Sequence, residues 1–210
     1  MARPTPTAAG ESDTVPGGEI HIGRPLIGFG GYASSGKDVV VDVLVGQGFK
    51  RTYMSKPLEQ ALLALNPQIV FEGNPSPNWM LYADLHAEVG YEASKRDPEV
   101  RRLLQRLGTE VGRKLFGENV WVDKMRTEVC EVLDAGGKIA VTGIRFPDEA
   151  NAIRELGGRL IWVSRPGCGP VNGHSSDNTL GPDDFDEVIV NDGTLDDLRA
   201  VVQILSPRWS

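Results

Sequence analysis

The amino-acid sequence predicts an α/β fold, in which helices cover both faces of a parallel β-sheet. Short apolar runs alternate along the chain with longer segments that have a helical period. This alternation is typical of parallel sheets, because a helix usually makes the crossover between two parallel strands. The runs are short and apolar, as expected for strands that are buried on both faces.

Strands are expected at residues 25–30, 49–54, 159–164 and 187–192, and after the glycine turn within residues 135–146. Ligands of such folds bind beyond the carboxyl ends of the strands. Three segments follow strands directly: the glycine-rich loop after residue 30, the turn at Ile144 and Arg145, and the loop that opens at Arg165. We therefore expect these three segments to meet at one edge of the sheet.

Helices are expected at residues 36–45, 55–65, 79–96, 100–115, 122–133, 147–156 and 194–205. Ser55 can cap the second of these, Pro57 suits its first turn, and Thr194 with Asp197 can form a capping box on the last. Residues 66–78 contain three prolines and are expected to form a loop. The most regular apolar stripe, which predicts one helix, consists of Val100, Leu103, Leu104, Leu107, Val111 and Leu115.

Length and charge restrict the class of protein. The chain has 210 residues, which fits one domain over residues 23–210 after a flexible N-terminal tail at residues 1–22. A formal net charge of -7 argues against binding to nucleic-acid polymers. Cys130 and Cys168 have no metal-binding spacing, and no apolar run approaches the roughly 18 residues of a membrane span. We expect a cytoplasmic protein with no membrane partner.

The stretch "GFGGYASSGKD", from Gly28 to Asp38, allows two interpretations. Gly31, Gly36 and Lys37 fit the G-x-x-x-x-G-K pattern of a phosphate-binding P-loop, whereas Gly28 and Gly30 with Ala33 fit the G-x-G-x-x-A pattern of a dinucleotide site. A dinucleotide site usually has an acid at the end of the second strand, which binds the ribose.

That position reads Lys50-Arg51-Thr52-Tyr53, with no acid, although Arg51 could accept a 2′-phosphate. The P-loop interpretation explains more residues, because the glycines allow backbone N–H groups to surround a phosphate and Lys37 adds positive charge. The expected fold is therefore a P-loop NTPase, a three-layer α/β/α sandwich with a parallel sheet and a lid loop. The expected phosphate-binding residues are Gly31, Ser34, Ser35, Gly36, Lys37, Asp38 and Val39.

Asp38 stands where a P-loop normally has the Ser or Thr that binds Mg²⁺. An aspartate can also bind Mg²⁺ through oxygen, which makes Asp38 the candidate metal ligand. It can alternatively serve as an acidic residue in the first turn of a helix, where it favours the helix dipole.

Phosphoryl transfer between two polyanions needs cations, and the sequence supplies arginines in suitable places. Arg102, Arg106 and Arg113 are four and seven residues apart and are expected to share one helix face, as acceptor-phosphate ligands or as a solvated basic face. Arg145 and Arg165 follow strands and can act in catalysis. The alternative for Arg145 is an ion pair with Asp148 or Glu149, and the alternative for Arg165 is an ordinary position in the loop. Candidate substrate contacts of lower specificity are Gln105, Thr109, Trp121 and His174. The alternatives are ordinary helix surface for Gln105 and Thr109, a core position for Trp121 and an exposed loop for His174, while His21 and His86 are taken as structural or incidental.

Four blocks in this order resemble the bacteriophage deoxynucleoside monophosphate kinases: "SSGKD", "LLQRLGTEVGRKLFGENVWVD", "IRFPDEANAIRELGGRLIWVSRPG" and "HSSD". The resemblance extends over about residues 25 to 195. It implies a kinase that uses ATP and Mg²⁺ to convert deoxynucleoside monophosphates to diphosphates. It also implies a host bacterial cytoplasmic location if the chain is of phage origin, and a homodimer as one possible state.

The chain departs from this family at three positions. Gly143 replaces the acid that usually ends the strand in the third block. Either Asp38, Asp148 or Glu149 takes over the role of this acid in holding Mg²⁺ or its water, or catalysis is impaired. Glu59 replaces a lysine, and Asp177 replaces a glutamate. Two alternatives therefore remain: a phosphomevalonate-type kinase, which shares the "SGKD" loop, and a nucleotide-binding module without catalysis. In either kinase, a lid at about residues 165–185 would exclude water from the site.

Overall fold

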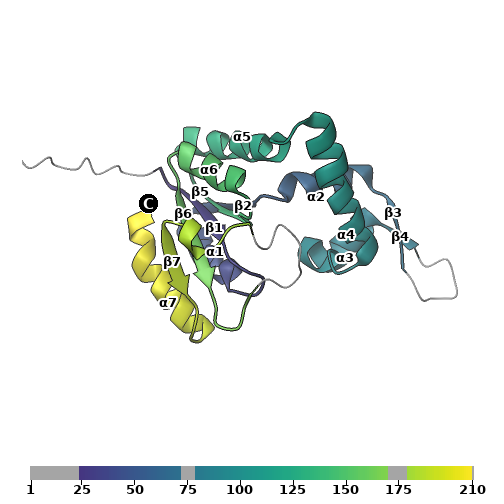
Figure 1. The fold of residues 1–210 in the computed structure, drawn as a ribbon. Coiled ribbons are helices and arrows are strands. Elements are labelled where there is room, and N and C mark those ends of the chain that lie inside the picture. The colour runs from purple at the N-terminus through teal and green to yellow at the C-terminus, as the bar shows by residue number, and fades with distance from the viewer. Residues whose placement is uncertain (1–23, 72–78, 170–178, 210) are drawn as a thin grey trace, which may run out of the picture.

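The computed structural model describes residues 24–71, 79–169 and 179–209 (Figure 1). The expected N-terminal tail at residues 1–22 lies outside these ranges. Within the described residues, no helix is long and apolar enough to cross a membrane.

The predicted parallel sheet is confirmed. Five strands pair in parallel in the order β2-β5-β1-β6-β7. They are β1 (Leu26–Gly30), β2 (Phe49–Tyr53), β5 (Lys138–Thr142), β6 (Arg159–Ser164) and β7 (Glu187–Val190). All five residues of the central strand β1 are buried, which explains why its sequence is apolar without alternation.

Helices cover both faces of this sheet, so the core has three layers (Figure 1). One face packs against α1 (Lys37–Gly46) and α7 (Leu195–Leu205) through Val41, Leu44 and Val202. The other face packs against α5 (Val120–Asp134) and α6 (Pro147–Glu155) through Val129 and Ile153. Two short 3₁₀ helices, η3 (Pro182–Asp184) and η4 (Ser206–Trp209), complete the C-terminal part. The Thr194–Asp197 capping box is present at the start of α7.

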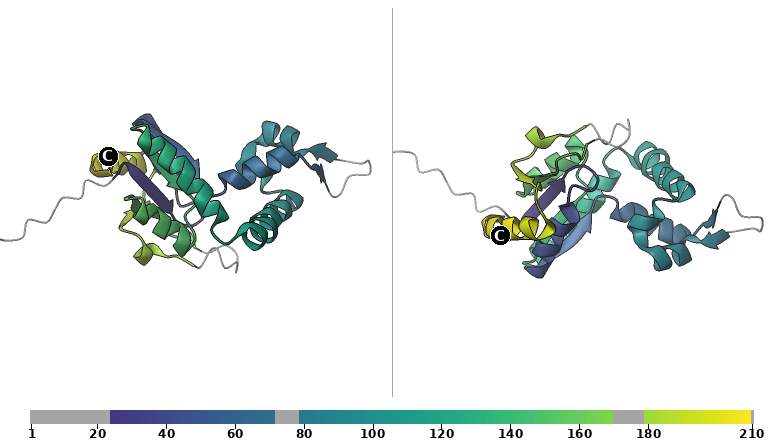
Figure 2. Two further views of the ribbon diagram at one scale, coloured as in Figure 1. Left: turned by 90° about the horizontal axis from the view of Figure 1, so that it is seen from above. Right: turned by 90° about the horizontal axis from the view of Figure 1, so that it is seen from below.

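Residues 56–116 form a helical unit with its own apolar cluster, centred on Leu62, Ile69, Tyr82, Val100 and Leu104. Its elements are α2 (Lys56–Leu65), β3 (Gln68–Val70), β4 (Trp79–Leu81), α3 (Tyr82–Ser94), α4 (Pro98–Gln105) and η1 (Arg106–Phe116). Figures 1 and 2 show this unit beside the sheet, on the side away from the C-terminus.

Two sequence expectations for this unit are wrong. The expected loop at 66–78 contains strand β3, and the expected helix at 79–96 begins with strand β4, which pairs with β3 in an antiparallel hairpin. The pairing buries Ile69 completely. Three-residue strands give too short a pattern to be recognised among prolines, and their tertiary partner decides their conformation. At the start of α2, Ser55 occupies the cap position without a side-chain cap bond.

The predicted single helix at 100–115 is divided by a change of winding. It is α-helical through Gln105 and π-helical from Arg106 to Phe116. A π-helix closes its hydrogen bonds over one more residue than an α-helix, so an α-helical period no longer returns to one face. Val111 and Leu115, which the stripe placed with the apolar residues, are therefore exposed by 38% and 71%.

The glycines of the dinucleotide interpretation lie inside β1 and are explained by packing. A Cβ atom on Gly28 would lie 2.7 Å from Leu160 Cδ2, and one on Gly30 would lie 2.2 Å from Phe185 Cζ. Arg51, the alternative 2′-phosphate ligand, forms ion pairs with Asp38 and Asp42. These contacts remove the features that supported a dinucleotide site.

Gly30→Ala is expected to lower the free energy of unfolding by about 1–3 kcal/mol, because the new methyl group overlaps the buried Phe185 ring. Gly46→Ala is the matched control, because no heavy atom lies within 4 Å of its Cβ position at the end of α1. Its expected effect is a slight stabilisation. Urea denaturation of both variants measures the difference, and equal effects would contradict the packing account.

Candidate functional site

The loop between β1 and α1 is shaped by residues in the left-handed backbone region. Gly31, Ser34 and Gly36 have φ values of 135°, 62° and 103°. A Cβ atom on Gly31 would lie 2.4 Å from the Val163 carbonyl oxygen. At Gly36 it would lie 2.6 Å from Asn191 Nδ2. The two glycines of the predicted P-loop are therefore required both by conformation and by space.

Lys37, at the start of α1, folds back over this loop. Its Nζ donates hydrogen bonds to the carbonyl oxygens of Gly31 at 2.7 Å and Tyr32 at 2.6 Å, and lies 3.3 Å from Ser35 Oγ. Burial lowers the pKa of Lys37 to about 8, and the positive charge of Arg145 acts in the same direction. The loop thus holds a cation at the carboxyl edge of the sheet, beside the N-terminus of a helix, which is the arrangement of an anion site.

Asn191, which follows β7 of the same sheet, supports the loop and was not predicted as a site residue from the sequence. It is only 3% exposed, its Nδ2 donates to the Ser35 carbonyl oxygen at 2.9 Å, and its backbone N–H donates to the Ser164 carbonyl oxygen at 2.7 Å. It follows β7 directly, at the same edge as the loop. A polar residue after a buried strand, in the "VND" stretch, was the signal that could have identified it.

Arg145 reaches the same edge from the turn after β5, as expected. Its charge is close enough to Lys37 to lower the pKa of that lysine. Gly143, which replaces the family's acid, has φ of 82° and open space around its Cβ position. The left-handed backbone, rather than crowding, therefore favours glycine at this position.

Glu149 holds the turn that carries Arg145. Its Oε2 accepts hydrogen bonds from the backbone N–H groups of Arg145 at 2.8 Å and Phe146 at 3.2 Å. The residue is 6% exposed, and burial raises the pKa of Glu149 to about 7, against the opposing effect of these two hydrogen bonds. The carboxylate thus satisfies the N-terminus of α6 and fixes the backbone of Arg145.

Arg113 faces the start of α6 from η1. Its guanidinium lies 4.9 Å from the centre of the Phe146 ring, and its nitrogens lie 3.9 Å from carboxylate oxygens of Asp148 and Glu118. Its side chain is 24% exposed. Arg113 is therefore placed between the helical unit and the turn that carries Arg145.

Arg102 and Arg106 have other surroundings, so the expected common face of the three arginines does not hold. Arg102 forms an ion pair with Glu99 of its own helix, at 2.5 Å, and Arg106 is exposed at the start of η1. The cause is the change from α-helical to π-helical winding at Arg106. Residues seven apart, such as Arg106 and Arg113, share a face of an α-helix but not of a π-helix. Gln105 and Thr109 are exposed on the same segment.

Trp121 supports η1 from α5. Its Nε1 donates to the Gly108 carbonyl oxygen at 2.8 Å, and a Cβ on Gly112 would lie 2.2 Å from the indole ring. This packing corresponds to the structural alternative that the sequence left open for Trp121.

The expected lid is only partly described. Arg165 is exposed at the end of β6, where its carbonyl oxygen accepts a hydrogen bond from the Cys168 N–H at 3.0 Å. Leu180 and Phe185 are 9% and 8% exposed and pack in the core of the α5–α6 face. These two residues of the expected lid therefore belong to the packed core, whereas Thr179 and residues 182–184 are exposed. His174 lies outside the described residues.

Asp38 and Val39 lie in the first turn of α1. Asp38 is exposed and paired with Arg51 of β2, while Val39 packs partly against the α1–α7 core. Among the residues that the structure describes, no group of three or more His, Cys, Asp or Glu side chains could hold a metal ion. His86, taken as structural, pairs with Glu59 at 2.5 Å inside the helical unit.

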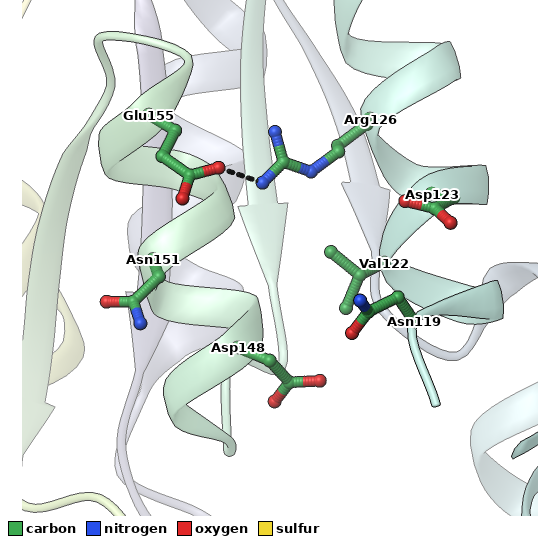
Figure 3. Close-up of a pocket in the computed structure, with 7 residues that line it drawn as sticks. All are labelled: Asn119, Val122, Asp123, Arg126, Asp148, Asn151 and Glu155. Atoms are coloured by element: carbon green, nitrogen blue, oxygen red, sulfur yellow. Dashed lines mark hydrogen bonds and ion pairs between the residues drawn. The ribbon is translucent and has the colours of Figure 1, made fainter. Parts of the chain in front are cut away.

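A groove of about 500 Å³ runs between α5 and α6 (Figure 3). It shares only Asp148 with the surroundings of Arg113, and the Arg126–Glu155 ion pair crosses its far end (Figure 3). Its other lining residues are Asn119, Val122, Asp123 and Asn151. Of the residues that the sequence predicted for the site, only Asp148, an alternative for the missing acid, lines this groove, whereas Lys37 and Arg145 do not.

Stability should fall as the pH rises from 4.5 to about 7, because Glu149 keeps its proton longer in the folded protein than in the unfolded chain. The change from a pKa of 4.5 to about 7 corresponds to at most about 3 kcal/mol in the free energy of unfolding. In Glu149→Gln, which keeps an oxygen acceptor but does not titrate, this fall should largely disappear. Urea denaturation at a series of pH values measures it.

Glu155→Gln, an exposed change on the same helix, is the control for this experiment and should keep the pH dependence of the unchanged protein. A Glu149→Gln variant with the same pH slope as the control would show that Glu149 is not the titrating group.

The family model described as deoxynucleotide monophosphate kinase matches residues 91–202. The chain is 30% identical over 105 residues to the deoxynucleotide monophosphate kinase of Escherichia phage RB69, and 34% identical over 105 residues to that of Enterobacteria phage T4. These matches cover 50% of this chain but 43% and 44% of the two phage proteins, so the chain matches less than half of their length.

A putative deoxynucleotide monophosphate kinase of Acanthamoeba polyphaga mimivirus is 25% identical over 202 residues, which cover 86% of this chain and 94% of the relative. Among solved structures, a dephospho-CoA kinase from Campylobacter jejuni matches 87% of this chain and 96% of its own, with a TM-score of 0.45 and 13% identity.

The family match covers more than half of the chain and includes α5, α6 and the turn that carries Arg145. The glycine loop at 31–37 lies outside the matched segment, so its geometry is independent support for a phosphate-binding fold. On this evidence, the chain belongs to the deoxynucleotide monophosphate kinase family.

Proposed function

We propose that this protein transfers the γ-phosphoryl group of ATP to deoxynucleoside monophosphates. The observation that carries the proposal is Lys37, whose Nζ folds over the glycine loop at the carboxyl edge of the sheet. The turn with Arg145, on the segment that the family model matches, ends at the same edge, and the charge of Arg145 lowers the pKa of Lys37. Positive side chains at one edge can neutralise the negative charge of a transferring phosphoryl group.

The donor phosphates would bind at the 31–37 loop. The residues fit this group, because Gly31 and Gly36 keep space open that a side chain would fill, and Lys37 supplies a positive charge. Ser34 and Ser35 lie between them, and Asn191 fixes the backbone at Ser35. The loop is thus held in one shape before a nucleotide binds, which reduces the entropic cost of binding.

Asp38 is the proposed ligand of Mg²⁺, which would arrive with ATP. Magnesium in such sites is usually held by one or two carboxylates together with phosphate oxygens and water. Asp38 supplies one carboxylate in the first turn after Lys37, but it pairs with Arg51, so the metal would compete with this ion pair. When bound, Mg²⁺ would neutralise phosphate charge.

The acceptor phosphate would bind between Arg145 and Arg113. Glu149 fixes the backbone that carries Arg145, and the start of α6 lies against Arg113. Both arginines can donate hydrogen bonds in pairs to phosphate oxygens, which orients the acceptor for in-line attack. Arg165 at the end of β6 would act on the donor side. Arg102, Arg106, Gln105 and Thr109 stay candidates for outer substrate contacts.

One observation favours a second candidate, a nucleotide-binding module without catalysis. The left-handed backbone at Gly143 disfavours the acid that the family has at this position. Such a module would bind ATP without turnover. A phosphomevalonate-type kinase would phosphorylate phosphomevalonate instead of a deoxynucleotide. One assay with these acceptors in parallel therefore separates the three functions.

Release of ADP should be measured with ATP and Mg²⁺ in the presence of dTMP, dGMP, dCMP, dAMP or phosphomevalonate. Turnover is expected with one or more deoxynucleotides. Lys37→Met should lower kcat by a factor of about 100 or more, because the variant loses the positive charge that would lie next to the transferred phosphoryl group. Lys124→Met, on the exposed side of α5, is the control and should leave kcat unchanged.

Turnover with phosphomevalonate alone would instead support the second kinase family. Tight ATP binding without turnover on any acceptor would favour the binding module and contradict the proposed function.

Asp38→Asn should raise the Mg²⁺ concentration that gives half-maximal turnover by about tenfold, because the variant loses the proposed carboxylate ligand. Asp42→Asn is a matched control, since Asp42 also pairs with Arg51 but lies a full turn further along α1. Titration of turnover with Mg²⁺ compares the two. An equal shift in both variants would mean that the Arg51 ion pairs, and not a metal site, cause the effect.

A further inference from the structure

Phe146 connects the two arginines of the proposed acceptor site. It follows Arg145 directly and is the residue before α6. Its backbone N–H donates to Glu149 Oε2 at 3.2 Å, next to the stronger bond from Arg145 at 2.8 Å. One buried carboxylate thus fixes the backbone of both residues, and with it the position from which the Phe146 ring projects.

The ring of Phe146 lies under the guanidinium of Arg113, 4.9 Å from ring centre to the central guanidinium carbon. This distance is within the range of a cation–π interaction. The carboxylates of Asp148 and Glu118 both lie 3.9 Å from Arg113 nitrogens, which is beyond hydrogen-bond distance. The ring therefore restrains the guanidinium at a place where neither carboxylate forms a hydrogen bond with it, while the carboxylates contribute charge.

Contact with a ring has a specific consequence for an arginine. The ring attracts the guanidinium through its face without accepting a conventional hydrogen bond, so the N–H donors stay available for a phosphate. A long side chain that is already oriented loses less conformational entropy when it binds a phosphate. Arg113 also comes from η1, a segment separate from α6, so the contact joins the helical unit to the sheet edge.

We propose that Phe146 is a positioning residue for acceptor binding, which holds the guanidinium of Arg113 in the orientation that receives the acceptor phosphate. This inference rests on the proposed function for the identity of the acceptor. It concerns the binding of the monophosphate and not the transfer step, so binding and turnover test different statements.

The test compares Phe146→Leu, which keeps an apolar side chain but removes the ring, with Phe146→Tyr, which keeps the ring. Calorimetry with dTMP and dGMP measures the acceptor Kd, and calorimetry with ATP measures the donor Kd. Phe146→Leu should raise the acceptor Kd and KM by about 3- to 30-fold, the range expected from a lost cation–π contact. The ATP Kd should stay unchanged, and Phe146→Tyr should restore acceptor binding.

A double-mutant cycle with Arg113→Met identifies the route of the effect. In the Arg113→Met background, Phe146→Leu should cause no further rise in the acceptor Kd, because the group that it positions is gone. Thermal unfolding of each variant checks that the fold is retained. A merely structural role would lower the active fraction and kcat without selectively changing the acceptor Kd.

The inference would be overturned by an unchanged acceptor Kd in Phe146→Leu, by an equal loss of ATP affinity, or by a full additional loss in the Arg113→Met background. If the unchanged protein binds deoxynucleoside monophosphates but does not transfer phosphate, the proposed function fails while the binding data still decide the role of Phe146. If it binds none of them, both proposals fail.

Discussion

The hydrogen bonds from the Lys37 ammonium to the carbonyl oxygens of Gly31 and Tyr32 close the loop on which the candidate site depends. Closure requires a backbone that turns through the left-handed region, and Gly36 occupies its last position. The loop backbone is also held by Asn191, whose side-chain amide donates a hydrogen bond to the Ser35 carbonyl oxygen. The order of the strands makes this possible, because β6 lies between β1 and β7 and all three parallel strands end at the same edge.

The opposite wall of the site depends on a second buried group, the carboxylate of Glu149. It holds the turn after β5 through two backbone N–H groups. Arg145 lies on this turn, where its charge lowers the pKa of Lys37, and Phe146 meets Arg113 of the helical unit. Positive side chains from three segments thus belong to this side of the molecule, and an anionic ligand can interact with them favourably.

Much of this arrangement could be predicted from the sequence. The buried strands, the P-loop glycines and the Arg145 turn follow from local patterns, because apolar runs and glycine spacing report on the immediate backbone. The π-helical winding of η1 could not be predicted, since the 3.6-residue period of Val100 to Leu115 fits an ordinary α-helix. Asn191 and Phe146 were missed as site residues, and Glu149 was expected only as one replacement for the missing acid, because their roles arise from tertiary contacts that no spacing reveals.

The most direct test of the account is the structure of the protein bound to a bisubstrate compound, in which a chain of phosphates joins adenosine to a deoxynucleoside. The phosphate chain is expected to run from the 31–37 loop, past Lys37, to Arg145 and Arg113. The deoxynucleoside end should lie on the side of the helical unit. Phosphates bound elsewhere, or an unoccupied space between Lys37 and Arg145 in such a complex, would contradict it.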